Sequence, residues 1–164
     1  MVDPLNVASK RGARSRTYGH DFERLIVRML KKRFAHYPWA EQLRRSDQTH
    51  HAHLPDVAGL PGIWPELQTG QSCTPEVKLE QAENDINCAW REGSEGVSAV
   101  VIYRRKRSRD VRVAMRISVL LKLLRINGIV PGALCMIEMS FTDFCEMYAR
   151  SGMPDRGCVD TETS

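Results

Sequence analysis

The tripeptide Thr74-Pro75-Glu76 constrains the fold more than any other part of this sequence, because all three residues favour the start of a helix. Threonine caps unpaired backbone N–H groups, proline fits the first helical position, and an acidic residue in the first turn complements the helix dipole. The pattern predicts a helix from here to about Trp90, ahead of Gly93. Residues of this segment are therefore expected on a helix and not on a strand.

Helical and extended patterns alternate on both sides of this segment. Apolar residues at helical spacing predict an amphipathic helix over 18–34, whereas β-branched and alternating runs predict strands. The predicted strands are 54–59, 63–70, 97–103, 111–116 and 133–140, and further helices are predicted at 118–126 and 141–150. Residues 39–47 are ambiguous, with a first strand as one interpretation.

This order of elements predicts one α/β domain over residues 18–151, with a mixed central β-sheet flanked by helices. At 164 residues the chain is long enough to bury a core of that size. Residues 1–17 are predicted to form a basic disordered arm and residues 152–164 a disordered tail, because both ends are polar with few large apolar residues.

Positive charge is clustered along the chain. Lysine and arginine outnumber aspartate and glutamate by 24 to 20, a mild excess that gives a formal charge of +4. The clusters are Lys10, Arg11, Arg14 and Arg16, and then Arg104, Arg105, Lys106, Arg107, Arg109 and Arg112. Such clusters are expected of a protein that binds a phosphate backbone, although a solvated surface explains them equally well on their own.

The five cysteines are scattered and lack the paired spacing of a zinc site. Their odd number fits a reducing compartment, so the chain is expected in the cytoplasm. No apolar run approaches the length of a membrane span, and no membrane partner is expected.

Leu60-Pro61-Gly62 supplies a turn between two predicted strands, with proline and glycine suited to the central positions of a type II turn. The flanking segments are therefore predicted to pair as a β-hairpin. Asp56 lies on the first strand and Glu66 on the second. The hairpin would bring these two carboxylates side by side.

Two adjacent carboxylates suit a divalent cation that cleaves phosphodiesters. Mg²⁺ prefers oxygen ligands and keeps several waters, and such an ion neutralises a phosphate and activates a water. Asp56 and Glu66 are therefore candidate ligands of Mg²⁺, or of Mn²⁺ in its place, together with the backbone carbonyl of Leu67. Gln68 shares a strand face with Glu66 and is a candidate for positioning the water.

The stretch from Arg44 to Ala82 resembles small phage-encoded nucleases of the PD-(D/E)XK superfamily, which includes Holliday-junction resolvases. Its pattern reads RRS-x-Q…PDVAGLPGIWPE-x-x-x-G…P-x-x-x-LEQA. The helix 19–33 also resembles the first helix of archaeal-type resolvases, which carries an acidic residue at the position of Glu23. The resemblance covers residues 18–115. It implies a restriction-endonuclease-like fold and metal-dependent cleavage of DNA.

Two registers of the motif compete. Residues 76–78 spell Glu-Val-Lys, the literal E-x-K, but the helix start places them on a helix, where residues two apart diverge by about 200°. Residues 66–68 spell Glu-Leu-Gln, keep the hairpin short and match the family pattern without gaps, with glutamine in place of the usual lysine. We favour the second register, while the first remains open.

The second register leaves the position of the family's lysine to the uncharged Gln68. Lys78 lies one turn before Gln81 on the same helix face, so we hypothesise that Lys78 reaches into the site while Gln81 contacts the scissile region. Glu23 is expected as a third acid, binding the metal directly or through water. A solvated surface position is the competing interpretation for Lys78 and for Glu23.

The resemblance also implies contacts with DNA. Arg45 and Ser46 match the family's R-x-S region and are expected to contact a phosphate. The basic run is expected to bind the nucleic-acid backbone through Arg104, Arg105, Lys106 and Arg107. The histidines at 50, 51 and 53 lie in a polar loop and are expected to be solvated, since no cysteine is near to complete a zinc site.

Together these features predict a Mg²⁺- or Mn²⁺-dependent DNA endonuclease, structure-specific in the manner of a Holliday-junction resolvase, in a prokaryotic or phage-infected cell. A four-way junction as substrate would imply a C₂ homodimer. The alternative is a nuclease-fold protein that binds DNA, with its chemistry weakened or lost through Gln68.

Overall fold

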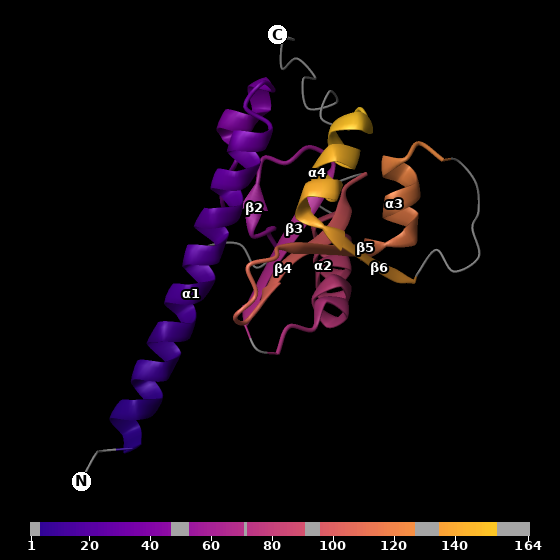
Figure 1. Cartoon of the computed structure of the whole chain (residues 1–164). Helices are drawn as coiled ribbons and strands as arrows, with labels where there is room; N and C mark the ends of the chain where they lie inside the picture. The colour runs from indigo at the N-terminus through magenta and orange to yellow at the C-terminus, as the bar shows by residue number, and fades with distance from the viewer. Residues whose placement is uncertain (1–3, 47–52, 71, 91–95, 127–134, 154–164) are drawn as a thin grey trace.

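The computed structural model describes residues 4–46, 53–70, 72–90, 96–126 and 135–153, with the backbone alone for 4–16 and 90. The helices are α1 (Pro4–Arg33), α2 (Pro75–Trp90), α3 (Ile117–Leu123) and α4 (Phe141–Arg150), with a short 3-10 helix η1 (Pro38–Gln42). The strands are β1 (Arg44–Arg45), β2 (Val57–Ala58), β3 (Ile63–Gly70), β4 (Ser98–Arg105), β5 (Arg112–Arg116) and β6 (Met136–Ser140). The predicted α/β class, a mixed sheet flanked by helices, is confirmed (Figure 1).

The main sheet has the strand order β3-β4-β5-β6. Strands β3 and β4 are parallel and are joined through α2, whereas β4, β5 and β6 pair antiparallel. Strand β3 is therefore one edge of this sheet and β6 the other. The edge position of β3 explains how the strand tolerates Pro65, which has no N–H to donate to a second neighbour.

Two separate cores cover the two faces of the sheet. The larger core lies under α1, α3 and α4 and buries large side chains such as Phe22, Phe34, Phe144 and Tyr148. The smaller core lies under α2 and consists of Trp64, Leu79, Ala82, Ala89, Ala99, Val101, Tyr103 and Ala114. Alternate residues of β4 enter opposite cores, because successive side chains of a strand point to opposite faces.

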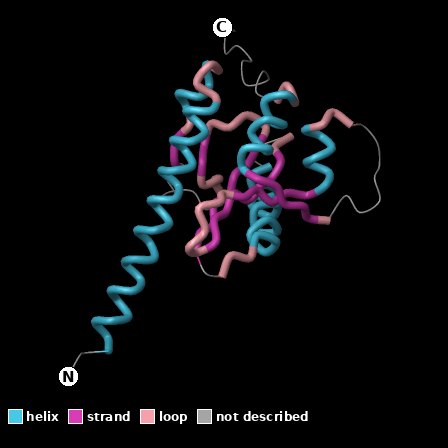
Figure 2. The backbone as a smooth tube through the Cα atoms, in the orientation of Figure 1, coloured by secondary structure: helices cyan, strands magenta, loops and turns pink. Residues whose placement is uncertain are grey.

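Helix α1 begins much earlier than predicted, so the prediction of a disordered arm over residues 1–17 is wrong for residues 4–17. Pro4 suits the first helical position, and most of the following residues are good helix formers, which outweighs Gly12. Figures 1 and 2 show the N-terminal half of α1 extending away from the rest of the molecule. At 30 residues the helix is about 45 Å long.

The predicted hairpin around Leu60-Pro61-Gly62 is only partly present. The turn exists, with Gly62 at a positive φ of 68° and a hydrogen bond from the Ile63 N–H to the Leu60 carbonyl. However, β2 pairs with β1, and β3 pairs with β4, so the two predicted strands are not partners in one sheet. The physical reason lies at Gly59, whose left-handed backbone (φ 91°) bends the chain after β2 and packs it against Gln42.

Residues 39–47, which were ambiguous, form η1 and β1 as far as the structure describes them. The predicted tail is described only to Met153, which packs into the larger core. Within the described ranges, no helix is both long and apolar enough to span a membrane.

Candidate active site

Asp56 lies directly before β2, next to the open edge of β3. Its Oδ2 accepts a hydrogen bond of 2.7 Å from the Leu67 N–H, and its own N–H donates to the Pro65 carbonyl at 3.1 Å. In an extended strand the N–H and C=O of one residue point to the same edge, so the Leu67 carbonyl also faces the Asp56 side. The structure thus brings Asp56 together with the carbonyl that was predicted as a metal ligand.

Glu66 points from β3 toward α2 and is almost completely buried, with 4% of its surface exposed. Its Oε1 accepts a hydrogen bond of 3.1 Å from the Trp64 indole, and its Oε2 lies 2.9 Å from Lys78 Nζ. Lys78 comes from the first turns of α2 and is itself largely shielded from solvent. The side chain hypothesised to replace the missing lysine therefore contacts the glutamate of the motif.

The pKa values of Glu66 and Lys78 are shifted by burial and by neighbouring charges. Burial, and then the negative charge of Asp56, raise the pKa of Glu66 from 4.5 to about 7, despite the opposing effect of Lys78. Burial on its own would lower the pKa of Lys78, but the hydrogen bond to Glu66 and the charges of Glu66, Asp56 and Asp85 raise it. Lys78 is thus held charged, whereas Glu66 is held toward its neutral form.

The literal E-x-K segment does not lie together as a unit. Residues 76–78 are helical, with Glu76 and Val77 exposed and only Lys78 turned toward β3. The charge of Glu76 acts on Arg116, on a different part of the α2 surface. The structure places Glu66, and not Glu76, beside Asp56.

The two glutamines of the predicted site differ in their surroundings. Gln68 follows Glu66 on the same strand face, and its Oε1 is buried without a hydrogen-bond partner among the described residues. Gln81 is exposed on α2, and its Oε1 lies 3.5 Å from Lys78 Nζ. Gln68 therefore has an unused acceptor facing the α2 side, while Gln81 is available on the surface beside Lys78.

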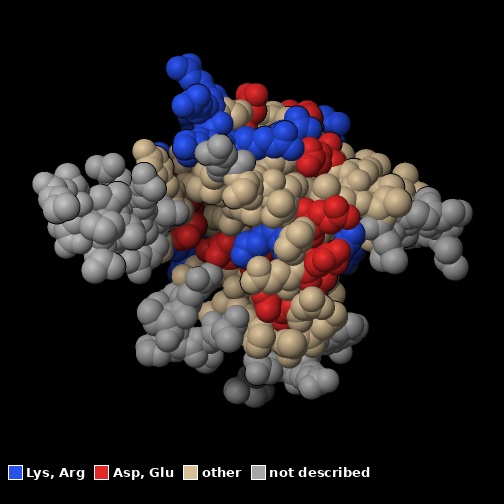
Figure 3. Space-filling view, turned by 90° about the horizontal axis from the view of Figure 1, so that it is seen from below, with Lys and Arg blue, Asp and Glu red and all other residues tan. Residues whose placement is uncertain are grey.

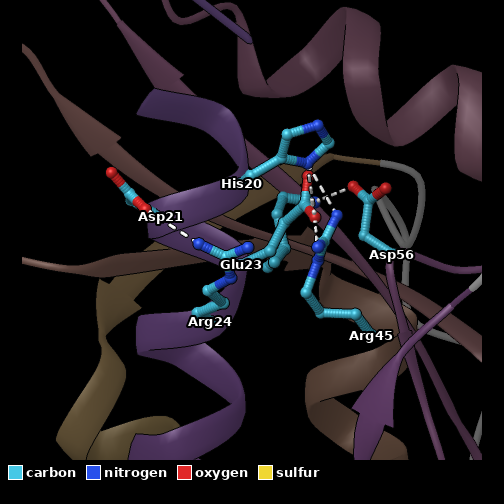
Figure 4. Close-up of polar contacts among 7 residues, drawn as sticks. His20, Asp21, Glu23, Arg24, Arg45 and Asp56 are labelled. Atoms are coloured by element: carbon cyan, nitrogen blue, oxygen red, sulfur yellow. Dashed lines mark hydrogen bonds and ion pairs between the residues drawn. The ribbon is translucent and has the colours of Figure 1, made fainter. Parts of the chain in front are cut away.

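Glu23 does not point at a carboxylate cluster; it forms an ion pair with Arg45. Arg45 Nε lies 2.5 Å from Glu23 Oε2, and Arg45 Nη2 lies 2.6 Å from His20 Nδ1. Figure 4 shows these three side chains grouped next to Asp56, whereas the pair of Arg24 and Asp21 points to the other side of α1. His20 was missed by the sequence reasoning, although its position one turn before Glu23 places both on one helix face.

Of the other predicted DNA contacts, Ser46 is bonded to Asp56 through the backbone. The Ser46 N–H donates to the Asp56 carbonyl at 3.1 Å, and the Ser46 Oγ is buried with no partner in the described part of the chain. Arg104 packs its guanidinium 5.0 Å from the Phe22 ring centroid on α1. The side chains of Arg105, Lys106 and Arg107 are exposed.

Charge is unevenly distributed over the surface. Figure 3 shows lysine and arginine side chains gathered along the upper side of the molecule, with acidic side chains next to them and a mixture of acidic and basic side chains below. The turn after β4 adds to the positive charge near α1, since Arg104 at the end of β4 contacts Phe22. This distribution suits the binding of a polyanion along one side of the domain.

His53 is the only one of the three loop histidines that falls within the described residues; His50 and His51 lie outside them. Its Nδ1 is 3.0 Å from Asp85 Oδ1, on the same α2 face as Lys78 and Gln81. The prediction that this histidine is simply solvated is therefore incomplete, because His53 is half exposed but pairs with an aspartate.

The residues present fit a small, hard cation better than a soft metal. Among the described residues there is no group of three or more His, Cys, Asp or Glu side chains arranged around a metal position. Mg²⁺ does not need such a group, since one or two carboxylates, a carbonyl and several waters complete its shell. Asp56, Glu66 and the Leu67 carbonyl are oxygen donors of that kind, and burial followed by the charge of Asp56 raises the pKa of Glu66.

Comparison with protein-family models, with curated proteins and with solved structures finds no match to this chain. The function is therefore inferred from the residues of the site themselves.

Proposed function

We propose that this chain is a Mg²⁺-dependent DNA endonuclease of the PD-(D/E)XK type, with a restriction-endonuclease-like fold. Asp56, Glu66 and the Leu67 carbonyl would hold the cation, which when bound neutralises the phosphate and activates a water. Lys78, Gln68 and Gln81 would position that water and the scissile phosphate. The substrate class is DNA, and a branched structure is the form that the sequence resemblance favours.

The observation that carries this proposal is the 2.9 Å contact between Lys78 Nζ and Glu66 Oε2, beside Asp56. Two acids and a lysine are the groups that the motif requires, and here the lysine comes from a helix in place of the strand position held by Gln68. Lys78 is largely buried where it contacts Glu66, which argues against an accidental contact. A solvated lysine would stay in water, because desolvating an ammonium is costly.

Each of these side chains has a definite task. Lys78 is held in its charged form, so it donates hydrogen bonds and stabilises negative charge on the phosphate; it does not accept the proton of the water. Trp64 fixes one oxygen of Glu66, and the Leu67 N–H fixes one oxygen of Asp56. These two bonds orient the carboxylates before any ligand binds, which lowers the cost of organising the site.

The test is cleavage of labelled four-way junction, flap and linear duplex DNA in Mg²⁺, Mn²⁺ or EDTA. We expect cutting only with a divalent ion, and at least a thousandfold loss in Asp56→Asn, which keeps an acceptor for the Leu67 N–H but removes the charge. Lys78→Met should lose about a hundredfold. Asp110→Asn, at an exposed loop acid, is the matched control and should cleave like wild type.

Circular dichroism and thermal melting of each variant distinguish loss of chemistry from loss of fold. Metal-independent cutting, or unchanged cutting by Asp56→Asn, would overturn the proposal. If a four-way junction is the preferred substrate, the active species should be a C₂ homodimer with two symmetric sites, which light scattering of the complex would reveal.

A second candidate function is binding of DNA without cleavage. It is favoured by one observation, the uncharged Gln68 at the position of the family's lysine, with a buried and unpartnered Oε1. This candidate predicts salt-dependent binding of branched DNA and no cutting with either metal. The same assay therefore separates the two functions.

A further inference from the structure

The end of β4 and the turn after it, residues 104–109, contain five lysine and arginine residues; this segment is called the basic turn. Arg105, Lys106, Arg107 and Arg109 are exposed, and within the described ranges none of these four forms an ion pair. Like charges so close together repel one another. The basic turn therefore favours a polyanion that would offset its charge.

The backbone of the basic turn is held in place by hydrogen bonds. The Lys106 N–H donates to the Gly70 carbonyl at 2.8 Å, and the Ser108 N–H donates to the Arg105 carbonyl at 3.0 Å. Arg107 has a φ of 67°, in the left-handed region that glycine adopts without steric cost. The charge of the arginine explains its presence at this position better than the geometry of the turn does.

Tyr18 lies beside the basic turn and is exposed over 69% of its surface. The Arg104 guanidinium is 5.0 Å from the centroid of the buried Phe22 ring, which brings the end of β4 against α1 (Figure 1). Tyr18 precedes Phe22 by four residues, so the two side chains lie on the same face of the helix. A large exposed aromatic side chain thus adjoins the basic turn.

This combination suits single-stranded DNA, because cations follow the phosphates of a strand while an aromatic ring stacks on one of its bases. In a duplex the bases are already paired and stacked, so Tyr18 would meet only the backbone. The other exposed large apolar side chains among the described residues are Val77, Leu124 and Ile126, on α2 and directly after α3. The basic turn therefore lacks the apolar surface that a membrane or a protein partner would bury.

We propose that Tyr18 and the basic turn bind the single-stranded part of a branched DNA, with one base stacked on Tyr18 and the phosphates on the cations of the turn. The inference rests on the proposed nuclease function and names the substrate form, a duplex with an unpaired flap. Tyr18 lies on the same turn of α1 as His20, which is next to Asp56 in Figure 4. One helix thus connects this surface to the candidate active site.

The first test measures fluorescence anisotropy of the full chain with a labelled single-stranded oligonucleotide and with a blunt duplex, in EDTA to prevent cleavage. Tyr18→Ala should weaken binding of the single strand about tenfold and of the duplex less than about twofold. Tyr18→Phe keeps the ring and should bind like wild type. Val77→Ala is the matched control, at an apolar position of similar exposure on α2. Equal weakening of both DNA forms in Tyr18→Ala, or a tenfold loss in Tyr18→Phe, would overturn the role of Tyr18.

The second test measures how salt affects binding of the single strand. A triple variant with Arg105→Gln, Lys106→Gln and Arg107→Gly should lower the slope of log affinity against log salt by about two, since three phosphate contacts are lost. The matched control removes three exposed charges elsewhere, at Arg28, Lys32 and Arg150, and should keep the wild-type slope. Equal slopes in the two triple variants would contradict the role of the basic turn.

Arg107→Gly alone separates binding from stability. Glycine relieves the left-handed backbone, so this variant should keep or raise the Tm while it weakens binding of the single strand. A lower Tm with unchanged binding would show that Arg107 serves the fold and not the DNA.

Cleavage distinguishes this inference from the function on which it rests. With Mg²⁺, wild type should cut a flap in preference to a linear duplex, and Tyr18→Ala should lose that preference. A chain that cuts both forms equally and binds single strands no better than Tyr18→Ala overturns the inference alone. A chain that binds single strands through Tyr18 but cuts no DNA with either metal overturns the proposed nuclease. Tighter binding of RNA of the same sequence would overturn the assignment to DNA.

Discussion

The two faces of the central sheet are covered in different ways. Under α1, α3 and α4 the core consists of large aromatic and aliphatic side chains, and the buried Phe144 and Tyr148 belong to it. Under α2 the core is smaller and contains four alanines beside Trp64 and Leu79, and there the sheet also buries Glu66 against Lys78. The first face supplies most of the apolar burial that stabilises the domain, whereas the second leaves room for ionisable groups.

The difference shows how one small domain can hold a charged pair in its interior. Burying an ion pair contributes little to stability, because the desolvation of both groups offsets their attraction. A fold that relied on the α2 face alone would have little apolar area to offset that cost. The apolar burial in the larger core therefore offsets the desolvation of the charged pair on the opposite face.

The strongest way to break this division is to remove a large side chain from the larger core. Phe144→Ala should lower the free energy of unfolding by about 3–5 kcal/mol, because a fully buried ring leaves a cavity. Urea denaturation measures this change, and Mn²⁺ affinity of the folded fraction should be unchanged. Thr142→Ala, at an exposed position of the same helix, is the control and should change little. A Phe144 variant with wild-type stability would contradict the assignment of the main core.

A second experiment uses pH to test the polar face. The folded pKa of Glu66 is raised to about 7, so this group favours the folded state most below pH 4.5 and loses that contribution as the pH rises to 7. The metal-free protein should therefore lose on the order of 2 kcal/mol over this range. Glu66→Gln should remove this part of the pH dependence and be the more stable protein at pH 7. Identical pH profiles for the two proteins would show that Glu66 is not buried as described.

A third change tests how the larger core fixes the turn before β3. The Tyr148 hydroxyl donates a hydrogen bond of 2.8 Å to the Pro61 carbonyl, which ties α4 to the turn at 60–62. Tyr148→Phe keeps the ring and should cost about 1 kcal/mol of stability, the typical net contribution of one hydrogen bond. Chemical denaturation measures it. A cost as large as that of Phe144→Ala would mean that the bond also sets the position of β3.

The smallest effect is expected at the rim of the larger core. Arg33 and Glu146 form an ion pair of 3.4 Å between α1 and α4, and both side chains are about half exposed. Glu146→Gln should change the unfolding free energy by less than about 0.5 kcal/mol, because solvent screens exposed pairs. A double-mutant cycle with Arg33→Gln gives the pair energy. A coupling above 1 kcal/mol would show that this contact matters to the docking of α1.

Much of the fold follows from local sequence signals. Helix α2 begins at Pro75 and ends at Trp90 as its start and stop residues predict, and β3 and α4 also have the predicted bounds. The partner of β2 was not predictable in this way, because strand pairing depends on how Gly59 directs the chain against Gln42. The full length of α1 was missed because its polar first half lacks the apolar stripe by which amphipathic helices are recognised.

The candidate site shows the same division between local and tertiary information. The sequence suggested Asp56, Glu66 and Lys78 as one group, and the structure brings them together. It did not suggest that Glu23 and His20 hold Arg45, since that contact joins a helix to a strand 22 residues further along and depends on packing.

Because Lys78 lies on α2, the geometry of the site depends on how that helix packs against the sheet. When an acid and a lysine share one strand, two residues of backbone fix their separation, even in a partly melted protein. Here the separation of Glu66 and Lys78 depends on how α2 packs on the smaller core of the sheet. Partial loosening of that helix would separate the charges while the sheet stays folded, so the proposed cleavage should vanish at lower denaturant than global structure does. Loss of the proposed cleavage would then report the separation of α2 from the sheet before the domain unfolds.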